Sequence, residues 1–484
     1  MSTISSVVIS ELRDHLAEGV RRARAANQEI IVSYISPFPD FSPLDAFAAA
    51  SELHGRRWYW RSPEEDLEVA GIGAAHEINA NGHARFDDVW REWQRLIAER
   101  VLLTDLGNDD AGSYHRGVGP QLFGGFSFRT ARPGGESRTT WGNFPDAGFI
   151  LPEVMFGRKD GQTWLTINQP VNDATDPAAL AERIERTINR LAMAPNDVEI
   201  KHGSYAPSVL KVVESDRTAW MESVRAVVEA IRRGRFDKAV LARSIRVEAP
   251  TPFDAARILR ELSREYPMCY RFAIQIGEKC FVGSTPELLA ARNGKSIHSM
   301  ALAGSAPRGR TALDDARLGA SLLTDEKNLG EHGLVVDSVR AALLPICDEL
   351  SMPEKPGLFK LPNVQHLYTP CTGRLRAQLN ILDIVRRLHP TPAVGGHPLR
   401  PALECIAEHE ALDRGWYAGP IGMVDASGDG AFAVAIRSAL LSGDQAELFA
   451  GCGIVEGSDP EVEFEESRLK LVPILSSLER SEAW

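Results

Sequence analysis

The segment GCGIVEGSDPEVEFEESRLKL, residues 451–471, combines glycines with many acidic side chains. In a helix that begins at Pro460, the residues Glu463, Glu466 and Lys470 would share one face, because their spacing is i, i+3 and i+7. Such a face is usually solvated, and a Glu466–Lys470 pair contributes roughly a few tenths of a kcal/mol. The alternative is that two carboxylates hold a hard cation such as Mg²⁺, which prefers oxygen ligands and keeps several waters. The spacing alone leaves both interpretations open.

A second acidic helix is expected over residues 324–343, TDEKNLGEHGLVVDSVRAAL, where Glu331 and His332 are neighbours. A histidine beside a glutamate raises the possibility of zinc, but H-E-x-x-H and other histidines at ligand spacing are absent. His332 is therefore expected to be a packed or hydrogen-bonded side chain. Glu331 is the better candidate for a metal ligand.

Three ionisable residues lie in or beside apolar segments. Lys238 starts the predicted strand KAVLAR, and a lysine there is usually a solvated strand end. Glu287 follows Pro286, where a glutamate is normally a helix-start charge. Arg437 lies in FAVAIRSALL (432–441), which we predict to be one buried strand. A buried arginine is either paired with a glutamate or offers its planar fork of donors to a substrate carboxylate.

Three segments are rich in glycine and proline and are flanked by apolar strands. They are MALAGSAPRGR (300–310), LHPTPAVGGHP (388–398) and RGWYAGPIG (414–422). Segments of this kind let the backbone approach a ligand closely. We interpret them as loops of the binding site.

The elements that must position these residues are strands mixed with helices. In residues 1–170 we predict strands and turns with helical insertions, including a strand at 30–35, an amphipathic helix at 86–99 and a strand at 121–128. Asp176-Pro177 should begin a helix that ends near Leu191.

Residues 193–215 are the best candidate for a connection between two parts of the chain. We expect residues 1–200 to form a strand-rich structural part and residues 201–484 the catalytic part, packed as one compact unit. There is no regular βαβ alternation and no G-x-G-x-x-G opening of a nucleotide fold. The expected fold class is α/β of the α+β type, with large, mainly antiparallel sheets and flanking helices.

Composition narrows the classes of function. The chain has 484 residues, of which 44% are hydrophobic and 25% charged, and its net charge of −12 argues against a nucleic-acid partner. Six scattered cysteines without a C-x-x-C pair suit a reducing compartment. We find no signal peptide and no apolar run of about 18 residues, so we expect no membrane partner and a cytoplasmic location. The sequence leaves a monomer and a homodimer equally open.

In order along the chain, nine stretches resemble the chorismate-utilising enzymes, the family of isochorismate, salicylate, anthranilate and aminodeoxychorismate synthases. They cover about residues 216–475 and read FDKAVLAR, GSTPELL, ALAGSAPRG, EHGLVV, VQHLYT, LHPTPAVGG, RGWYAGPIG, FAVAIRSAL and GCGIVEGSDPEVEFEESRLKL. FGGF at 123–126 adds a weaker likeness. The resemblance implies sheets and helices around a single deep cleft, in which Mg²⁺ holds the ring carboxylate of chorismate.

The resemblance also implies roles for individual residues. Lys238 matches the general base and Glu287 the general acid, while Glu331 and Glu466 match direct metal ligands and Glu463 a ligand through water. The substrate-binding residues implied are Ala303, Gly304, Ser305, His389, Tyr417, Arg437, Gly451, Gly453 and Lys470. A lysine that acts as a base must lose its proton, so we expect Lys238 to be buried or close to other cations.

Within the family, two features favour water as the nucleophile, and a third indicates the branch. Aminodeoxychorismate synthases often have a nucleophilic lysine where this chain has Ala303. The loop LHPTPAVGG, with His389 and apolar Ala393-Val394, resembles the isochorismate type, and no glutaminase partner is then expected. Ser438 after Arg437 resembles the menaquinone or phylloquinone branch.

Three alternatives remain. The first is a salicylate synthase, which tends to have threonine near Ala393 and finishes with elimination of pyruvate. The second is an amination subunit of the anthranilate synthase type. The third is a catalytically inactive homologue acting as a scaffold, which would be expected to lack an acid, base or metal ligand; all of these are present in this chain.

Overall fold

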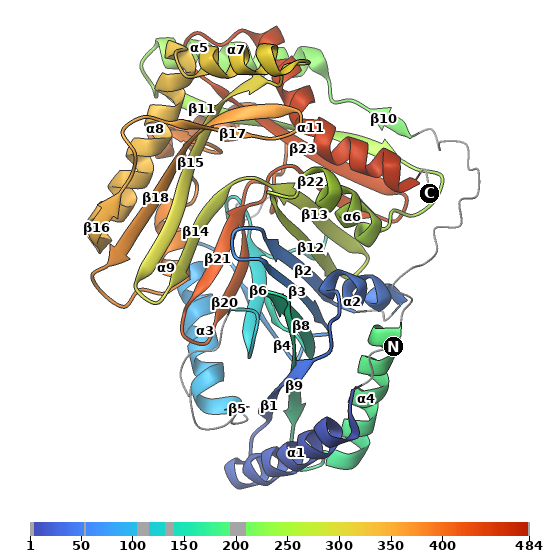
Figure 1. Cartoon of the computed structure of the whole chain (residues 1–484). Coiled ribbons are helices and arrows are strands. Elements are labelled where there is room, and N and C mark those ends of the chain that lie inside the picture. Colours follow the sequence, from blue (N-terminus) through green and yellow to red (C-terminus); the bar gives the residue numbers. More distant parts are fainter. Residues whose placement is uncertain (1–3, 53–54, 104–115, 131–139, 194–209, 483–484) are drawn as a thin grey trace.

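The computed structural model describes residues 4–52, 55–103, 116–130, 140–193 and 210–482. These residues form two large sheets with helices on their outer faces (Figure 1). The helices are α1 (Ser6–Ala26), α2 (Pro43–Ala49), α3 (Arg85–Arg100), α4 (Pro177–Met193), α5 (Arg217–Arg232), α6 (Ala255–Glu265), α7 (Ala312–Leu322), α8 (Glu326–Leu343), α9 (Ile381–Leu388), α10 (Leu399–His409) and α11 (Pro460–Glu482).

The larger sheet has 13 strands and contains both early and late parts of the chain. In spatial order its main path is β10 (Lys211–Val213), β11 (Lys238–Glu248), β23 (Gln445–Ile454), β22 (Ser438–Ser442), β13 (Lys279–Thr285), β12 (Tyr270–Ile276), β2 (Arg57–Ser62), β3 (Leu67–Ile72), β8 (Val154–Lys159), β9 (Gln162–Val171), β1 (Ile30–Phe38) and β5 (Val101–Leu103). The short β19 (Gly396–His397) pairs with β11 beside this path.

The smaller sheet has 10 strands and is also mixed in origin. Its path is β16 (Cys347–Ser351), β18 (Val364–Leu375), β15 (Ser296–Pro307), β14 (Leu288–Asn293), β21 (Gly430–Val434), β20 (Pro420–Asp425), β6 (Gln121–Phe126), β7 (Ala147–Leu151) and β4 (His76–Ala80), with β17 (Gly357–Lys360) on β18. Among the described strands, every pairing in both sheets is antiparallel except that of β1 with β5. The predicted fold class, large and mainly antiparallel sheets with flanking helices, is confirmed.

Most predicted elements are present. The strand at 30–35 is part of β1, the helix at 86–99 is α3, and the helix from Asp176-Pro177 is α4. Helix α1 was not predicted, although it has two clear signals. Leu12 and Leu16 are fully buried on one of its faces, and the side chain of the N-cap residue Ser5 accepts a hydrogen bond from Val8 N. The boundary proposed near residue 200 lies outside the described residues.

Two sequence predictions were wrong: a loop at residues 300–307, and a single strand at residues 432–441 around Arg437. MALAGSAP (300–307) is no loop but the larger, C-terminal part of β15, which contains a bulge at Gly304, whose φ is +75°. FAVAIRSALL is not one strand, because Arg437 adopts a left-handed conformation with a φ of +52° and separates β21 from β22. This conformation ends the extended backbone, so the chain leaves the smaller sheet and enters the larger one.

The chain passes between the two sheets at several places, and two of these passages are neighbours. One is the passage from β13 to β14 through Glu287, and the other is the passage from β21 to β22 through Arg437. Ser284 N donates to the carbonyl of Arg437 at 3.1 Å, and Val434 N donates to the carbonyl of Glu287 at 3.0 Å. The two crossings are therefore hydrogen-bonded to each other.

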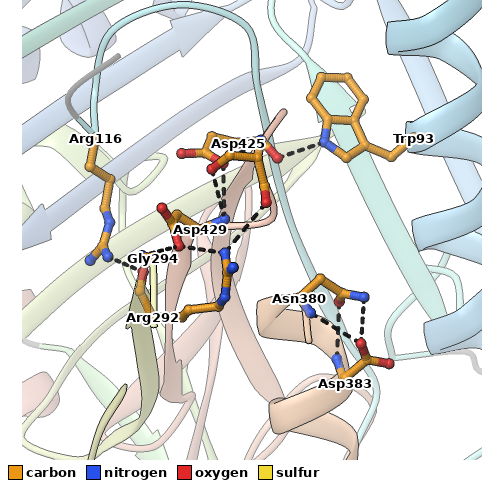
Figure 2. A network of polar contacts seen from close by, with 9 residues as sticks. Trp93, Arg116, Arg292, Gly294, Asn380, Asp383, Asp425 and Asp429 are labelled. Carbon is orange, nitrogen blue, oxygen red and sulfur yellow. Dashed lines mark hydrogen bonds and ion pairs between the residues drawn. The ribbon is translucent and has the colours of Figure 1, made fainter. Parts of the chain in front are cut away.

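A separate polar network links the ends of β14, β20 and β21 that lie away from Glu287 (Figure 2). Arg292 of β14 is paired with Asp429 in the turn between β20 and β21, at 2.5 Å, and Trp93 of α3 donates to the carbonyl of Asp425. Asn380 and Asp383 form a capping box at the start of α9.

No described helix is both long and apolar enough to cross a membrane.

Candidate active site

Lys238 is the first residue of β11 and is fully buried, with 0% of its side chain exposed. Its Nζ lies 2.8 Å from Oε1 of Glu331 on α8. Nζ makes no further hydrogen bond to the described residues. A buried lysine side chain with one partner retains hydrogen-bonding capacity that a ligand could use. Lys238 is therefore buried as expected, and it is directly linked to the best metal-ligand candidate of the second acidic helix.

Glu287 lies at the crossing between the sheets and is only 3% exposed. Burial raises the pKa of its carboxyl group to about 7, although the charges of Lys238, Arg437 and Lys470 act in the opposite direction. These influences place Glu287 near all three cationic groups. A carboxyl group that titrates near neutrality can be protonated at working pH, which a general acid requires.

Arg437 is buried and offers unused hydrogen-bonding capacity. Its Nε has no partner among the described residues. Buried donors without partners are costly, so a polar ligand that pairs with them is strongly favoured. Beside Arg437, the ring of Tyr417 stacks on Phe449 with centroids 5.2 Å apart, and burial raises the pKa of its hydroxyl to about 12.

The acidic face of α11 meets α8. Lys327 Nζ of α8 lies 3.2 Å from Oε1 of Glu463, and Lys470 Nζ lies 2.6 Å from Oε1 of Glu466. Burial, followed by the charge of Glu466, raises the pKa of Glu463. Burial alone would also raise the pKa of Glu466, but the charge and hydrogen bond of Lys470, together with the charges of Lys327 and Arg437, lower the pKa overall. Lys327 also experiences the charge of Glu331, so three carboxylates converge around one ammonium group.

This convergence fits a hard divalent cation better than a soft one. Ligand atoms of Cys452, Glu463 and Glu466 lie within 4.8 Å of one another. However, Cys452 Sγ donates to the carbonyl of Glu463 at 3.1 Å, and burial raises the pKa of this thiol well above its usual value. A protonated thiol is a poor ligand. The remaining donors are carboxylate oxygens, which Mg²⁺ prefers.

Two glycines of β23 keep space open beside these groups. A Cβ atom on Gly453 would lie 2.8 Å from Cε of Lys238 and would also collide with Glu331. A Cβ atom on Gly451 would lie 3.2 Å from the hydroxyl of Tyr417. Lys470 Nζ donates to the carbonyl of Gly451 at 3.0 Å, which joins α11 to this strand. The absence of side chains at both positions is therefore needed for the packing of the site.

The bulge of β15 brings the predicted segment Ala303–Ser305 next to the same group. Asn328 of α8 accepts a hydrogen bond from Ser305 N at 3.1 Å. Ser305 Oγ lies 2.9 Å from Nδ1 of His366 on β18. Burial, followed by the charges of Arg437 and Lys470, lowers the pKa of His366 well below its usual value. His366 is thus a neutral ring that lies close to the cationic groups.

His389 is placed differently from the other predicted residues. Its Nε2–H donates to the carbonyl of Phe128 at 2.9 Å, and its ring meets the Phe128 ring edge-on. Burial lowers the pKa of His389 to about 3. This hydrogen bond links His389 to the segment at Phe128. Among the described residues, no hydrogen bond or ion pair joins His389 to another candidate site residue. Its predicted role in substrate binding stays a prediction.

The structure adds residues that the sequence analysis did not single out. His366 lies within the stretch VQHLYT, and that stretch was the only signal for it. Lys327 lies four residues before Glu331, a spacing that places both on one face of α8. Arg414 and Glu410, fully buried beside β11, gave no signal beyond their place in or near RGWYAGPIG.

A buried lysine, a buried carboxyl group whose pKa is raised to about 7 and several nearby cationic side chains are typical of an enzyme site for an anionic substrate. The chain matches the family model "Chorismate binding enzyme" over residues 18–479 and belongs to that family.

Three relatives illustrate the similarity. The chain is 36% identical over 469 residues to the isochorismate synthase MenF of Bacillus subtilis (strain 168), covering 96% of this chain and 97% of that protein. It is 34% identical over 474 residues to the salicylate biosynthesis isochorismate synthase of Pseudomonas aeruginosa, with 98% and 95% covered. Among solved structures, MenF, the menaquinone-specific isochorismate synthase from Escherichia coli, superimposes with a TM-score of 0.75 at 25% identity, covering 97% of this chain and 100% of that one.

Proposed function

We propose that the protein is a magnesium-dependent isochorismate synthase, in which Lys238 is the general base and Glu287 the general acid. The observation that carries this proposal is the burial of both groups in one polar centre, with the pKa of Glu287 raised to about 7. One group can take a proton while the other gives one, and both are needed for the reaction.

The reaction exchanges a hydroxyl group between two ring carbons. Water adds its oxygen to C2 of chorismate while Lys238 accepts the proton that it loses. The ring double bonds shift, the C4–O bond breaks, and the departing hydroxide takes the proton of Glu287 and leaves as water. One water is consumed and one is released, so chorismate and isochorismate are isomers. Hydroxide is a poor leaving group unless it is protonated, which is why the neutral form of Glu287 matters.

The two carboxylates of the substrate need cationic partners inside an acidic protein. We assign the enolpyruvyl carboxylate to Arg437 and Tyr417, supported by the unpaired Nε of Arg437. Gly451 and Gly453 leave room for a carboxylate, and Lys470 and the segment Ala303–Ser305 border the same place.

We assign the metal to Glu331 and Glu466 directly and to Glu463 through water. Support comes from three carboxylates grouped around Lys327, with no other soft donor than a protonated thiol among them. A bound Mg²⁺ would offset the charge of the ring carboxylate. The carboxylates themselves are held in place by Lys327, Lys470 and Lys238.

We further propose that water, and not an amine, is the nucleophile, because Ala303 is buried and carries no amino group. No glutaminase partner is then required. Ser438 supports the menaquinone branch. Six free, buried cysteines support a reducing compartment such as the cytoplasm.

The test is incubation of purified protein with chorismate and Mg²⁺, followed by chromatography of the products. Isochorismate is the expected product. Salicylate with pyruvate as the main product at neutral pH would favour a salicylate synthase. An aminated product that appears only with ammonium would move the protein to the amination branch.

A further inference from the structure

A fully buried ion pair lies behind the strand that carries Lys238. Arg414 and Glu410 have side chains that are 2% and 1% exposed. The guanidinium group makes a two-pronged contact, with Nε 2.7 Å from Oε1 and Nη2 2.6 Å from Oε2 of the carboxylate. Its centre lies 4.2 Å from the centroid of the Phe128 ring. The geometry leaves both side chains with very little freedom.

The remaining polar atoms of this pair bind main-chain groups on two segments. Arg414 donates from Nη2 to the carbonyl of Val240 at 2.6 Å and from Nη1 to the carbonyl of Val394 at 2.8 Å. Glu410 Oε2 accepts from Ala242 N at 2.7 Å. One ion pair therefore offers β11 a donor and an acceptor, as the backbone of a neighbouring strand would.

This edge of β11 has little other support. The two-residue strand β19 pairs with Lys238 and Ala239, and Val240 N donates to the carbonyl of Gly395 at 2.8 Å. Beyond the ion pair, β10 pairs only with residues 246–248 of β11. The carbonyl of Arg414 also accepts from Tyr417 N at 2.8 Å. Arg414 thus contacts the strand of the base, the loop at Val394 and the chain that leads into Tyr417.

We infer that Arg414 and Glu410 are positioning residues, which hold the strand of Lys238 in register for the reaction. The inference rests on the proposed function for the role of Lys238. An apolar pair of similar volume could fill the space and keep the protein stable. It would leave the carbonyl groups of Val240 and Val394 and the amide of Ala242 unpaired in the interior, so the strand would shift.

The experiment compares Arg414→Lys with the matched control Arg292→Lys. Arg292 is also a buried arginine, bonded to the carboxylate of Asp429 (Figure 2) and to a carbonyl. It lies near the end of β14, whereas Glu287 directly precedes that strand. For each variant, one measures kcat, the dissociation constant for chorismate, the melting temperature and hydrogen exchange in the peptide 238–243. A lysine keeps the charge at position 414 but cannot span all three acceptors.

The expected result is a split between turnover and binding. Arg414→Lys should lower kcat by about 10- to 100-fold, because a displacement of roughly 1 Å has that effect, while chorismate affinity changes by less than about 3-fold. Hydrogen exchange in 238–243 should rise. Arg292→Lys should melt earlier, keep kcat within about 2-fold and leave that exchange unchanged.

A second variant, Glu410→Gln, covers the case in which Arg414→Lys does not fold. Its amide oxygen can still accept from Ala242 N, so the protein should fold and lose kcat by a smaller factor. The inference is overturned if kcat of the tested variant stays at the parental value. It is also overturned if kcat and chorismate affinity fall together, in proportion to the loss of melting temperature seen with Arg292→Lys. If the parent does not convert chorismate, the proposed function fails. Hydrogen exchange in residues 238–243 still shows whether Arg414 and Glu410 fix the position of β11.

Discussion

At the scale of the residue, Glu287 shows how position changes the chemistry of a common side chain. The same carboxyl group in water would be ionised at neutral pH. Here the crossing between two sheets removes it from solvent, and burial raises its pKa to about 7 in spite of three nearby cations. The sequence around it, STPELL, gives no sign of this, because the burial is created by strands that are distant in the chain.

The raised pKa of Glu287 predicts the pH dependence of the reaction. The protonated acid predominates below about pH 7, so kcat/KM should decrease as the pH rises through about 7. Glu287→Gln should abolish turnover, since an amide cannot donate the proton, while chorismate binding remains. Glu465→Gln, at an exposed carboxylate paired with Arg468, is the matched control and should keep the parental profile. A parental profile that stays flat across this range would contradict the role of Glu287.

The candidate residues could be predicted only in part. Taken singly, Lys238, Glu287 and Glu466 have types and spacings that are typical of solvated charges. The ordered stretches of family resemblance proposed their roles, and the structure brings most of them into one group. His366 and Arg414 were missed because their importance depends on hydrogen bonds to residues remote in the chain, which spacing does not reveal.

At the scale of the element, helix α11 carries the clearest agreement between sequence and structure. The i, i+3, i+7 spacing predicted one face for Glu463, Glu466 and Lys470, and the helix begins at Pro460 as expected. The Glu466–Lys470 ion pair of the first interpretation is formed, but the face is not solvated, because Glu463 is only 1% exposed. The carboxylates also lie near Glu331, and the metal site of the second interpretation stays a prediction. By contrast, Arg437 was predicted within a strand, and its left-handed backbone was not foreseeable from an apolar run.

This face of α11 predicts a change in metal dependence. Glu466→Gln should raise the Mg²⁺ concentration for half-maximal binding by at least about 10-fold, because it replaces a charged oxygen ligand with a neutral one. Calorimetric titration with Mg²⁺ measures this without turnover, and Glu465→Gln on the adjacent position is the control. An unchanged Mg²⁺ affinity in Glu466→Gln would instead support a purely structural ion pair with Lys470.

At the scale of the whole molecule, both sheets combine strands from the first 200 residues with strands from the rest of the chain. In the larger sheet, β12 pairs with β2 through residues 271–275 and 57–61. In the smaller sheet, β20 pairs with β6 through residues 421–425 and 121–125. The antiparallel class could be predicted from alternating strands without βαβ units. The pairing of remote strands could not, because no local pattern specifies a partner so far along the chain.

We therefore propose that residues 1–200 complete the fold instead of forming a module of their own. Residues 201–484 expressed alone should be insoluble or melt without a cooperative transition, since the edges of β12 and β20 would be open. Co-expression with residues 1–200 should restore a soluble complex. Solubility and thermal melts followed by circular dichroism provide the measurement. A cooperative melt of the isolated 201–484 fragment would show that it is an independent domain.

The pairing of β2 with β12 also affects how the protein is made. Strand β2 pairs with β3 soon after it is made, but its other neighbour is remote: β2 ends at Ser62 and β12 begins at Tyr270, so 208 residues must be added before that pairing can start. At about 5–20 residues per second, this takes roughly 10 to 40 s on the ribosome. During that time the edge of β2 that pairs with β12 in the finished sheet has no partner strand. We therefore expect the nascent chain to carry an open strand edge, a site prone to association with other chains, during much of its synthesis.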